Sequence, residues 1–160
     1  MLDLASGSGL VAIAAAAAGA ASVTPSETDS LAAAAIKLNA GVNRVRLEPT
    51  VGDLLDGPGL GPADVLPGDP PGDPPGVLLG LLPGADVVLA GDAFYDRGMA
   101  GLMLPFLERA SQAGALVLVG DPGRAYLPRE RFARVATYDV PVERVIEDAD
   151  VKHTTVWRLR

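Results

Sequence analysis

The sequence contains no cysteine and only one histidine, His153. Without cysteine the chain has neither a structural disulfide nor a thiolate metal site, and one histidine cannot build a multi-histidine site, so no metal is expected. Aromatic residues make up only 4% of the chain, so valine, leucine, isoleucine and alanine must fill the core. That mixture favours a parallel sheet covered by helices over an aromatic-rich β-sandwich.

Basic residues are also scarce in most of the chain. The first 120 residues carry 5 basic and 13 acidic side chains, the last 40 carry 8 and 7, and the net charge is −7. No stretch is strongly basic, which disfavours nucleic acid as a partner. No secretory signal is evident, and the alanine run Ala14–Ala18 is too short to span a bilayer. We therefore expect a cytoplasmic protein that has no membrane partner.

Strand and helix patterns alternate along the chain. We expect strands at residues 1–5, 22–26, 44–47, 86–90, 115–120, 135–138 and 154–159, and helices at residues 10–18, 30–39, 99–113 and 128–134. Asp29 or Ser30 is placed to cap the second helix, and Pro105 is expected to bend or restart the third. The alternation predicts an α/β domain with a Rossmann-like, doubly wound, mostly parallel sheet. The last two strands lack a clear helix between them, which predicts an antiparallel final strand.

Residues 57–84 interrupt this alternation. Eight of these 28 residues are glycine and eight are proline, a composition that cannot form a packed helix or strand. We interpret the segment as a flexible insertion within a single domain of residues 1–160. The first strand begins at Met1 although it is expected to be the central strand, so an N-terminal segment is predicted to be missing.

A glycine-rich turn, Asp3–Gly9, joins the first expected strand to the first expected helix. From Gly7 to Ala12 it fits the dinucleotide fingerprint G-x-G-x-x-G/A, and Glu27 lies twenty residues after Gly7, where a ribose-binding acid belongs. Gly7 and Gly9 let a cofactor approach the backbone without a Cβ clash. This spacing alone leaves an NAD-dependent oxidoreductase open.

Three further features favour S-adenosyl-L-methionine as the cofactor. Asp3 lies inside the strand, where a carboxylate does nothing for a pyrophosphate but offsets the ammonium and sulfonium charges of this cofactor. Asp53 follows the third expected strand and can accept a hydrogen bond from the adenine amino group, while Leu54 packs on the ring. Asp92 and Tyr95 follow the fourth, where a nucleophile would meet a methyl group. The expected cofactor-binding residues are Asp3, Ala5, Ser6, Gly7, Gly9, Glu27, Asp53 and Leu54.

Four segments carry a family resemblance across nearly the whole chain apart from the Pro/Gly-rich insertion. They are Leu2–Ile13, Leu89–Asp96, Val119–Pro128 and Val151–Leu159. They resemble the class I, seven-β-strand S-adenosylmethionine-dependent methyltransferases, most closely the electron-transfer-flavoprotein β-subunit lysine methyltransferases and their bacterial relatives. The resemblance implies N-methylation of a lysine side chain in a protein substrate, such as the electron transfer flavoprotein β subunit or a ribosomal protein. We expect a monomer.

The family's D-x-x-Y motif falls on Asp92 and Tyr95, and the resemblance implies that both face the substrate nitrogen. Asp92 is expected first to orient the amine, with a role as base second, and Tyr95 to wall the methyl channel. Glu27 stands where the family usually has a ribose-binding Asp. We expect Arg124 either to contact an acidic substrate or to be a solvated side chain. Three alternatives remain open: a small-molecule, nicotinamide-type N-methyltransferase, an NAD-binding oxidoreductase, and an inactive truncated binding domain.

Overall fold

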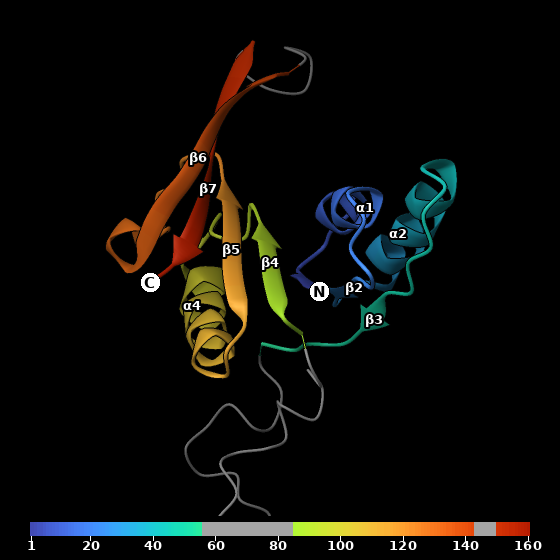
Figure 1. Ribbon diagram of the computed structural model, residues 1–160, viewed down its shortest axis with the longest axis horizontal. Helices are drawn as coiled ribbons and strands as arrows, with labels where there is room; N and C mark the ends of the chain where they lie inside the picture. Colours follow the sequence, from blue (N-terminus) through green and yellow to red (C-terminus); the bar gives the residue numbers. More distant parts are fainter. Residues whose placement is uncertain (56–84, 143–149) are drawn as a thin grey trace, which may run out of the picture.

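The computed structural model describes residues 1–55, 85–142 and 150–160. Its strands form one seven-stranded sheet in the order β3-β2-β1-β4-β5-β7-β6 (Figure 1). The strands are β1 (Leu2–Leu4), β2 (Thr24–Glu27), β3 (Thr50–Val51), β4 (Val87–Gly91), β5 (Leu116–Asp121), β6 (Phe132–Pro141) and β7 (Val151–Leu159). Strands β1 to β5 are parallel, whereas β7 runs antiparallel to β5 and β6. The predicted fold class is therefore confirmed.

Three α-helices and one 3-10 turn complete the described structure. They are α1 (Leu10–Ala17), α2 (Ser30–Val42), α4 (Arg97–Gln112) and η1 (Arg129–Arg131). Asp29 caps α2 by accepting a hydrogen bond from the Leu31 amide, at 2.8 Å. Helix α4 passes through Pro105 without restarting. None of the helices described is long and apolar enough to cross a membrane.

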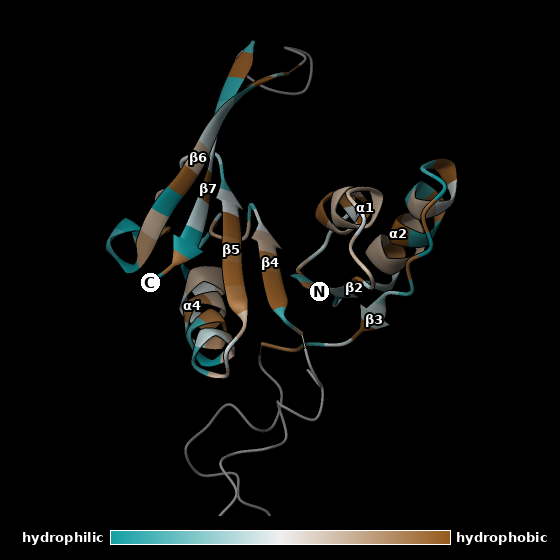
Figure 2. Cartoon of the chain, viewed as in Figure 1, coloured by the Kyte–Doolittle hydropathy of each residue, from teal (hydrophilic) through white to brown (hydrophobic). Residues whose placement is uncertain are grey.

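The core lies in two clusters on opposite faces of the sheet. Alternate residues of a strand point to opposite faces, and β1 shows this directly. Leu2 and Leu4 pack with β4, β5 and α4, while Asp3 between them reaches the amide of Ala12 in α1. Residues of α1 and α2 form the second cluster. The apolar colouring of β4 and β5 follows from burial in this central position (Figure 2).

The prediction of a strand at residues 44–47 is wrong. The Val45 amide instead donates to the Ala40 carbonyl at 3.0 Å, and Arg44 takes a positive φ of 58°, so the chain is still turning out of α2. Leu47 is buried against the two N-terminal helices, not in the sheet. The true third strand follows at Thr50–Val51 and pairs with the end of β2. The alternating apolar residues Val45 and Leu47 pack against helices α1 and α2 and do not form a strand.

The last two strands are longer than expected. β6 begins at Phe132 and β7 at Val151, and they pair along their length with one register shift between Arg134 and Ala136. Because β7 is antiparallel, its first residues lie at the edge of the sheet where β4 and β5 end. The insertion predicted at residues 57–84 lies outside the described residues.

Candidate functional site

Two hollows open at the carboxyl ends of the parallel strands, the edge at which open α/β sheets bind their ligands. The larger hollow has a volume of about 440 Å³ and is lined by residues that follow β1, β2, β3 and β4, with the start of α4. The smaller hollow, about 300 Å³, is lined by residues of β1, α1, β7 and the ends of β4 and β5. Ala5 lines both hollows. Because they share Ala5, the two hollows are adjoining parts of one candidate site around the turn after β1.

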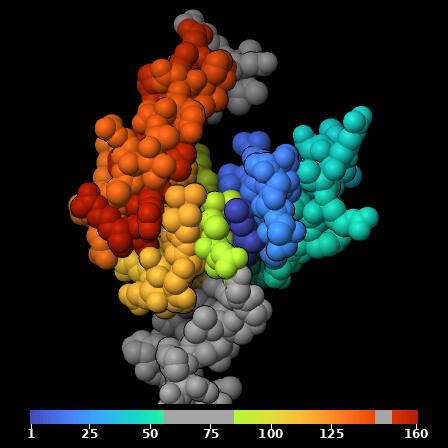
Figure 3. Space-filling view, viewed as in Figure 1, coloured from blue at the N-terminus to red at the C-terminus, as the bar shows by residue number. Residues whose placement is uncertain are grey.

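Two of the three residues other than glycine that have a positive φ in the described structure line these hollows. Ala5 and Asp92 have positive φ angles of 49° and 51°, in the left-handed region that residues other than glycine rarely adopt. They follow β1 and β4, which are neighbours in the sheet and lie side by side at the centre of the molecule (Figure 3). The Asp92 amide is held by the Gly120 carbonyl at 2.7 Å. Such strain costs about 1–3 kcal/mol per residue and clusters at functional sites.

Two glycines are required by packing around the turn. A Cβ on Gly9 would lie 3.1 Å from side-chain atoms of Ile36, and Gly9 also has a φ of 86°. A Cβ on Gly91 would lie 2.7 Å from Val11. A larger residue at either position would require Ile36 or Val11 to move, so the two glycines allow the close packing around α1. Gly9 therefore has a structural role in addition to its predicted role at the cofactor.

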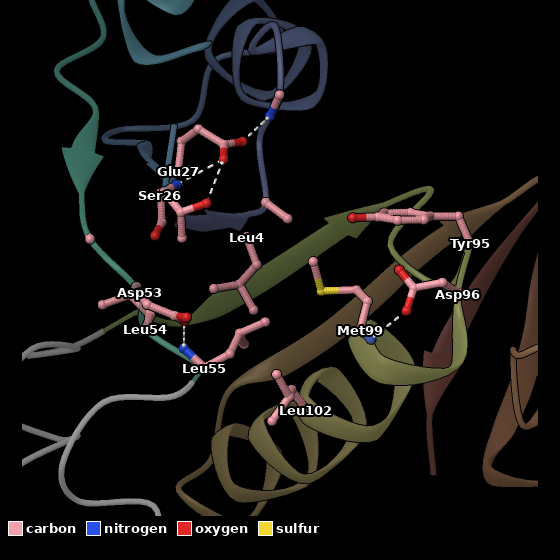
Figure 4. A pocket seen from close by; sticks show the side chains of 14 residues that line it. Leu4, Ser26, Glu27, Asp53, Leu54, Leu55, Tyr95, Asp96, Met99 and Leu102 are labelled. Atoms are coloured by element: carbon pink, nitrogen blue, oxygen red, sulfur yellow. Dashed lines mark hydrogen bonds between the residues drawn. The ribbon is translucent and has the colours of Figure 1, made fainter. Parts of the chain in front are cut away.

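Glu27 projects into the larger hollow from the end of β2 (Figure 4). Its Oε2 atom accepts a hydrogen bond from the Gly7 amide, and its Oε1 atom accepts one from the Thr28 amide, both at 2.8 Å. These backbone donors hold the carboxylate beside the glycine turn. The Oε1 atom also accepts longer hydrogen bonds from Thr28 Oγ1 and the Asp29 amide, both at 3.3 Å. A carboxylate oxygen has about two acceptor positions, so the position left for a ribose hydroxyl is on Oε2.

The far end of the larger hollow is mainly apolar. Leu54 lines it after β3, and Met99 and Leu102 line it from α4 (Figure 4). Asp53 accepts a hydrogen bond from the Leu55 amide at 2.8 Å, which shapes the turn that presents Leu54. Apolar walls with a few placed polar groups suit a flat heteroaromatic ring joined to a sugar. The larger hollow thus has the character of a nucleoside site.

Asp3 is the buried acid of the smaller hollow, only 1% exposed. Its Oδ2 atom accepts hydrogen bonds from Ser6 Oγ at 2.8 Å and from the Ala12 amide at 3.0 Å. Its Oδ1 atom is buried and accepts no hydrogen bond from the residues described. Burial raises the pKa of Asp3 to about 6, and the Ser6 and Ala12 hydrogen bonds only partly offset this.

The position of Asp3 discriminates between two kinds of cofactor. In dinucleotide-binding proteins a pyrophosphate sits at the N-terminus of the first helix. Here the carboxylate of Asp3 already accepts the Ala12 amide, in the first turn of α1. A second anion at this place would be repelled, whereas a cationic group would be attracted. The geometry therefore favours a cofactor with ammonium and sulfonium charges over NAD.

Asp92 is paired with Arg124, a contact that was not among the expectations for either residue. Arg124 Nε lies 2.6 Å from Asp92 Oδ1, and its Nη2 atom lies 2.7 Å from Asp92 Oδ2. The backbone of the turn that carries Arg124 is held by buried Asp121, which accepts hydrogen bonds from the Gly123 and Arg124 amides at 2.7 and 2.8 Å. The sequence shows Asp121 and Arg124 close together, but no spacing rule connects them to residue 92.

The two residues of the D-x-x-Y motif line different hollows. Asp92 lines the smaller hollow, and Tyr95, 53% exposed, lines the larger one. Lys152 and Thr154 also line the smaller hollow and were not among the expected site residues. The signal that places them is the antiparallel last strand, which starts where the parallel strands end. The roles of all these side chains in catalysis stay predictions.

Comparison with known proteins points to one class. The sequence model of the ribosomal protein L11 methyltransferase (PrmA) family matches residues 1–66. The chain is 31% identical to the electron transfer flavoprotein beta subunit lysine methyltransferase of Danio rerio, an alignment that covers 99% of this chain and 55% of that protein. The chain thus spans about half the length of the curated relatives it matches.

Solved structures share the fold. A protein of Thermoplasma acidophilum superposes with a TM-score of 0.62 and 17% identity, over 99% of this chain and 77% of its own. The tRNA (uracil-54, C5)-methyltransferase of Pyrococcus abyssi, solved with S-adenosyl-L-homocysteine, gives a TM-score of 0.58 and 15% identity, over 98% of this chain and 33% of its own. At these identities the likeness concerns the fold.

Proposed function

We propose that this chain is a class I S-adenosylmethionine-dependent methyltransferase that transfers a methyl group to the side-chain amine of lysine in a protein substrate. The observation that carries the proposal is the meeting of two hollows at Ala5. One has the groups that a nucleoside needs, and the other presents the carboxylate of Asp92 to an amine. Lysine methylation is also the activity named for the relatives of known function.

The residues of the site fit S-adenosyl-L-methionine, which is the cofactor of this class. Glu27 would accept the ribose hydroxyls, and Leu54 would pack against the adenine. The buried Oδ1 atom of Asp3 has no donor among the described residues, so Asp3 would offset the positive charge of the methionine portion. The backbone of Ser6 and Gly7 would lie against the cofactor, since a Cβ on Gly7 would meet only open space.

When bound, S-adenosylmethionine supplies an electrophilic methyl group on a sulfonium sulfur. The chain's own residues then have to position an amine on the far side of that methyl group and exclude competing water. Asp92 can accept an N–H of the amine, which fixes the direction of the nitrogen lone pair. Tyr95 would form one wall of the approach. In water lysine has a pKa of about 10.4, so the site must also favour the neutral amine.

The proposed substrate follows from the activities for which the relatives are named. Those with a named activity act on the electron transfer flavoprotein β subunit, and the matching family model is named for ribosomal protein L11. We propose the electron transfer flavoprotein β subunit as the first substrate to test, and a ribosomal protein as the second. A monomeric, cytoplasmic enzyme remains part of the proposal.

Methyl transfer followed by mass spectrometry tests this function. The full-length protein is incubated with S-adenosylmethionine and purified electron transfer flavoprotein β subunit, and the product is digested and sequenced by tandem mass spectrometry. The expected result is methylation confined to lysine side chains. The control is the same substrate with its lysines acetylated chemically, which leaves no nucleophilic side-chain amine. Nicotinamide is assayed in parallel, and turnover of nicotinamide without turnover of protein would contradict the proposed substrate class.

A further inference from the structure

The Asp92–Arg124 ion pair raises a question that the proposed function must answer. A lone carboxylate near a lysine side chain favours the charged ammonium. The ammonium has no lone pair with which to attack a methyl group. An acid placed to orient the amine therefore also opposes the reaction, unless its negative charge is balanced.

Arg124 supplies that balance with a defined geometry. It engages both oxygens of Asp92, at 2.6 and 2.7 Å, the two-pronged arrangement in which arginine binds carboxylates most strongly. Each oxygen retains a further acceptor position. The paired carboxylate can thus still accept an N–H while the pair as a whole carries no net charge.

The position of Arg124 is built into the fold. The Asp121 side chain is 1% exposed and accepts the Arg124 amide, which fixes the turn after β5. The Asp92 backbone is held from the same strand, through the Gly120 carbonyl. The end of β5 therefore positions the backbone of both partners of the ion pair. Their side chains are only half-exposed, at 48% for Asp92 and 38% for Arg124.

We infer that Arg124 is a positioning residue that neutralises Asp92, so that the pair orients the substrate lysine in its unprotonated form. The inference rests on the proposed function and adds a specific selection for the neutral amine. Arg124 acts through Asp92, and contact between Arg124 and the substrate is not required.

Other charged groups face the same space and enter the test. Asp3 of β1 and Lys152 of β7 line the smaller hollow, and buried Asp121 lies under the turn that carries Arg124. Tyr95 and Asp96 follow Asp92 in the chain, and Asp96 caps α4 at the Met99 amide. The titration of Asp3 near pH 6 lies well below the pH range in which a lysine amine loses its proton.

The pH profile of kcat provides the decisive readout. At saturating substrate, kcat reports ionisations within the enzyme–substrate complex, so its acid limb follows the bound amine. The full-length protein is assayed on the electron transfer flavoprotein β subunit with six forms of the enzyme: wild type, Arg124→Gln, Arg124→Lys, Asp92→Asn, the double variant Arg124→Gln/Asp92→Asn, and Lys152→Gln. The exposed Arg46→Gln serves as the matched control.

Opposite shifts are expected for the two single variants. Arg124→Gln leaves Asp92 uncompensated, so the acid limb moves up by about one pH unit or more and kcat at a pH below the limb falls about ten-fold. Asp92→Asn moves the limb down. The double variant returns the limb to the wild-type position with a lower plateau. Arg124→Lys loses the two-pronged contact with Asp92 but retains the positive charge. The limb should therefore stay near its wild-type position.

The outcomes separate the inference from the proposed function. A wild-type enzyme that transfers no methyl group to protein overturns the proposed function. An active wild type, with an acid limb in Arg124→Gln that stays in place while only kcat falls, overturns the inference and assigns Arg124 a purely structural role. A limb that moves in Lys152→Gln but not in Arg124→Gln assigns charge balance to Lys152 instead. Calorimetry with S-adenosylhomocysteine verifies that each variant retains the folded cofactor site.

Discussion

The two hollows of the site hold their acids in different ways. In the larger hollow, Glu27 is half-buried and Asp53 is exposed, and both are held by backbone amides, mostly of their own turns. In the smaller hollow, Asp3 is buried, and Asp92 is held by a side chain thirty-two positions later in the chain. Under the proposed function, nucleoside recognition would depend on local turns, whereas methyl transfer would depend on burial and long-range charge pairing. Changes in the two hollows should therefore affect different measurements.

The largest effect is expected at Asp92. Asp92→Ala removes the acceptor that orients the amine, and loss of orientation of a nucleophile reduces kcat on the order of a hundred-fold or more. The affinity for S-adenosylhomocysteine should stay within about two-fold, because Asp92 does not line the larger hollow. Methyl transfer by mass spectrometry and binding by calorimetry measure the two quantities separately. Glu48→Gln, an exposed acid paired with Lys37, is the matched control.

A parallel loss of cofactor affinity in Asp92→Ala would contradict the division between the hollows. Unchanged methyl transfer in this variant would remove Asp92 from the mechanism.

The next effect is expected in the larger hollow. Glu27→Ala removes a charged acceptor for the ribose hydroxyls, worth about 1.5–3 kcal/mol, or roughly ten- to a hundred-fold in affinity. Glu27→Asp keeps the carboxylate and should lose much less. Isothermal titration calorimetry with S-adenosylhomocysteine measures both. Equal affinity in wild type and Glu27→Ala would withdraw the assignment of Glu27 to the ribose.

The ionisation of Asp3, in the smaller hollow, is expected to make the free energy of unfolding depend on pH. Its pKa in the folded protein is raised from 3.8 to about 6, so between these values the folded state binds more protons than the unfolded state. The free energy of unfolding therefore falls as pH rises through this range, by up to about 3 kcal/mol from this group. Asp3→Asn lacks this dependence and should gain stability relative to wild type between pH 4 and pH 7. Urea unfolding at several pH values measures the difference, and a difference that is independent of pH would show that Asp3 is already ionised at pH 4.

The smallest effect is expected at Tyr95. The side chain is 53% exposed and lines the larger hollow, and we expect its ring to act as a wall. Tyr95→Phe should then retain most of the activity, whereas Tyr95→Ala should lose more of it through a higher KM. Steady-state kinetics of both variants decide the point. A greater loss in Tyr95→Phe than in Asp92→Ala would assign the chemistry to the hydroxyl group.

The contrast between local turns and long-range contacts also explains which features could be predicted from the sequence. The glycine turn, the cap at Asp29 and the acid at Glu27 depend on spacings of a few residues or on one strand–helix unit, and the structure places them as expected. The mostly parallel sheet was predictable because parallel strands are joined by crossover helices, so the two kinds of element alternate along the chain. Such features can be predicted from the sequence because each depends on contacts between residues close together in the chain.

Features that depend on distant contacts were missed. The pair formed by Asp92 and Arg124 joins the ends of two strands, and no local pattern indicates it. The false strand at residues 44–47 arose because Val45 and Leu47 alternate with polar residues, yet they pack on α1 and α2. Periodicity gives the faces of a segment but not the partner that covers each face.

The most direct test of the account is a crystal structure of the full-length protein with S-adenosylhomocysteine. We expect the adenine to lie against Leu54, the ribose hydroxyls to hydrogen-bond to Glu27, and the sulfur to lie beside Ala5, facing Asp92. In that arrangement the nucleoside fills the larger hollow, the amino acid portion lies near Asp3, and the part of the smaller hollow beside Asp92 remains open for an amine. A nucleoside bound outside the larger hollow, or a sulfur turned away from Asp92, would contradict this placement of cofactor and substrate.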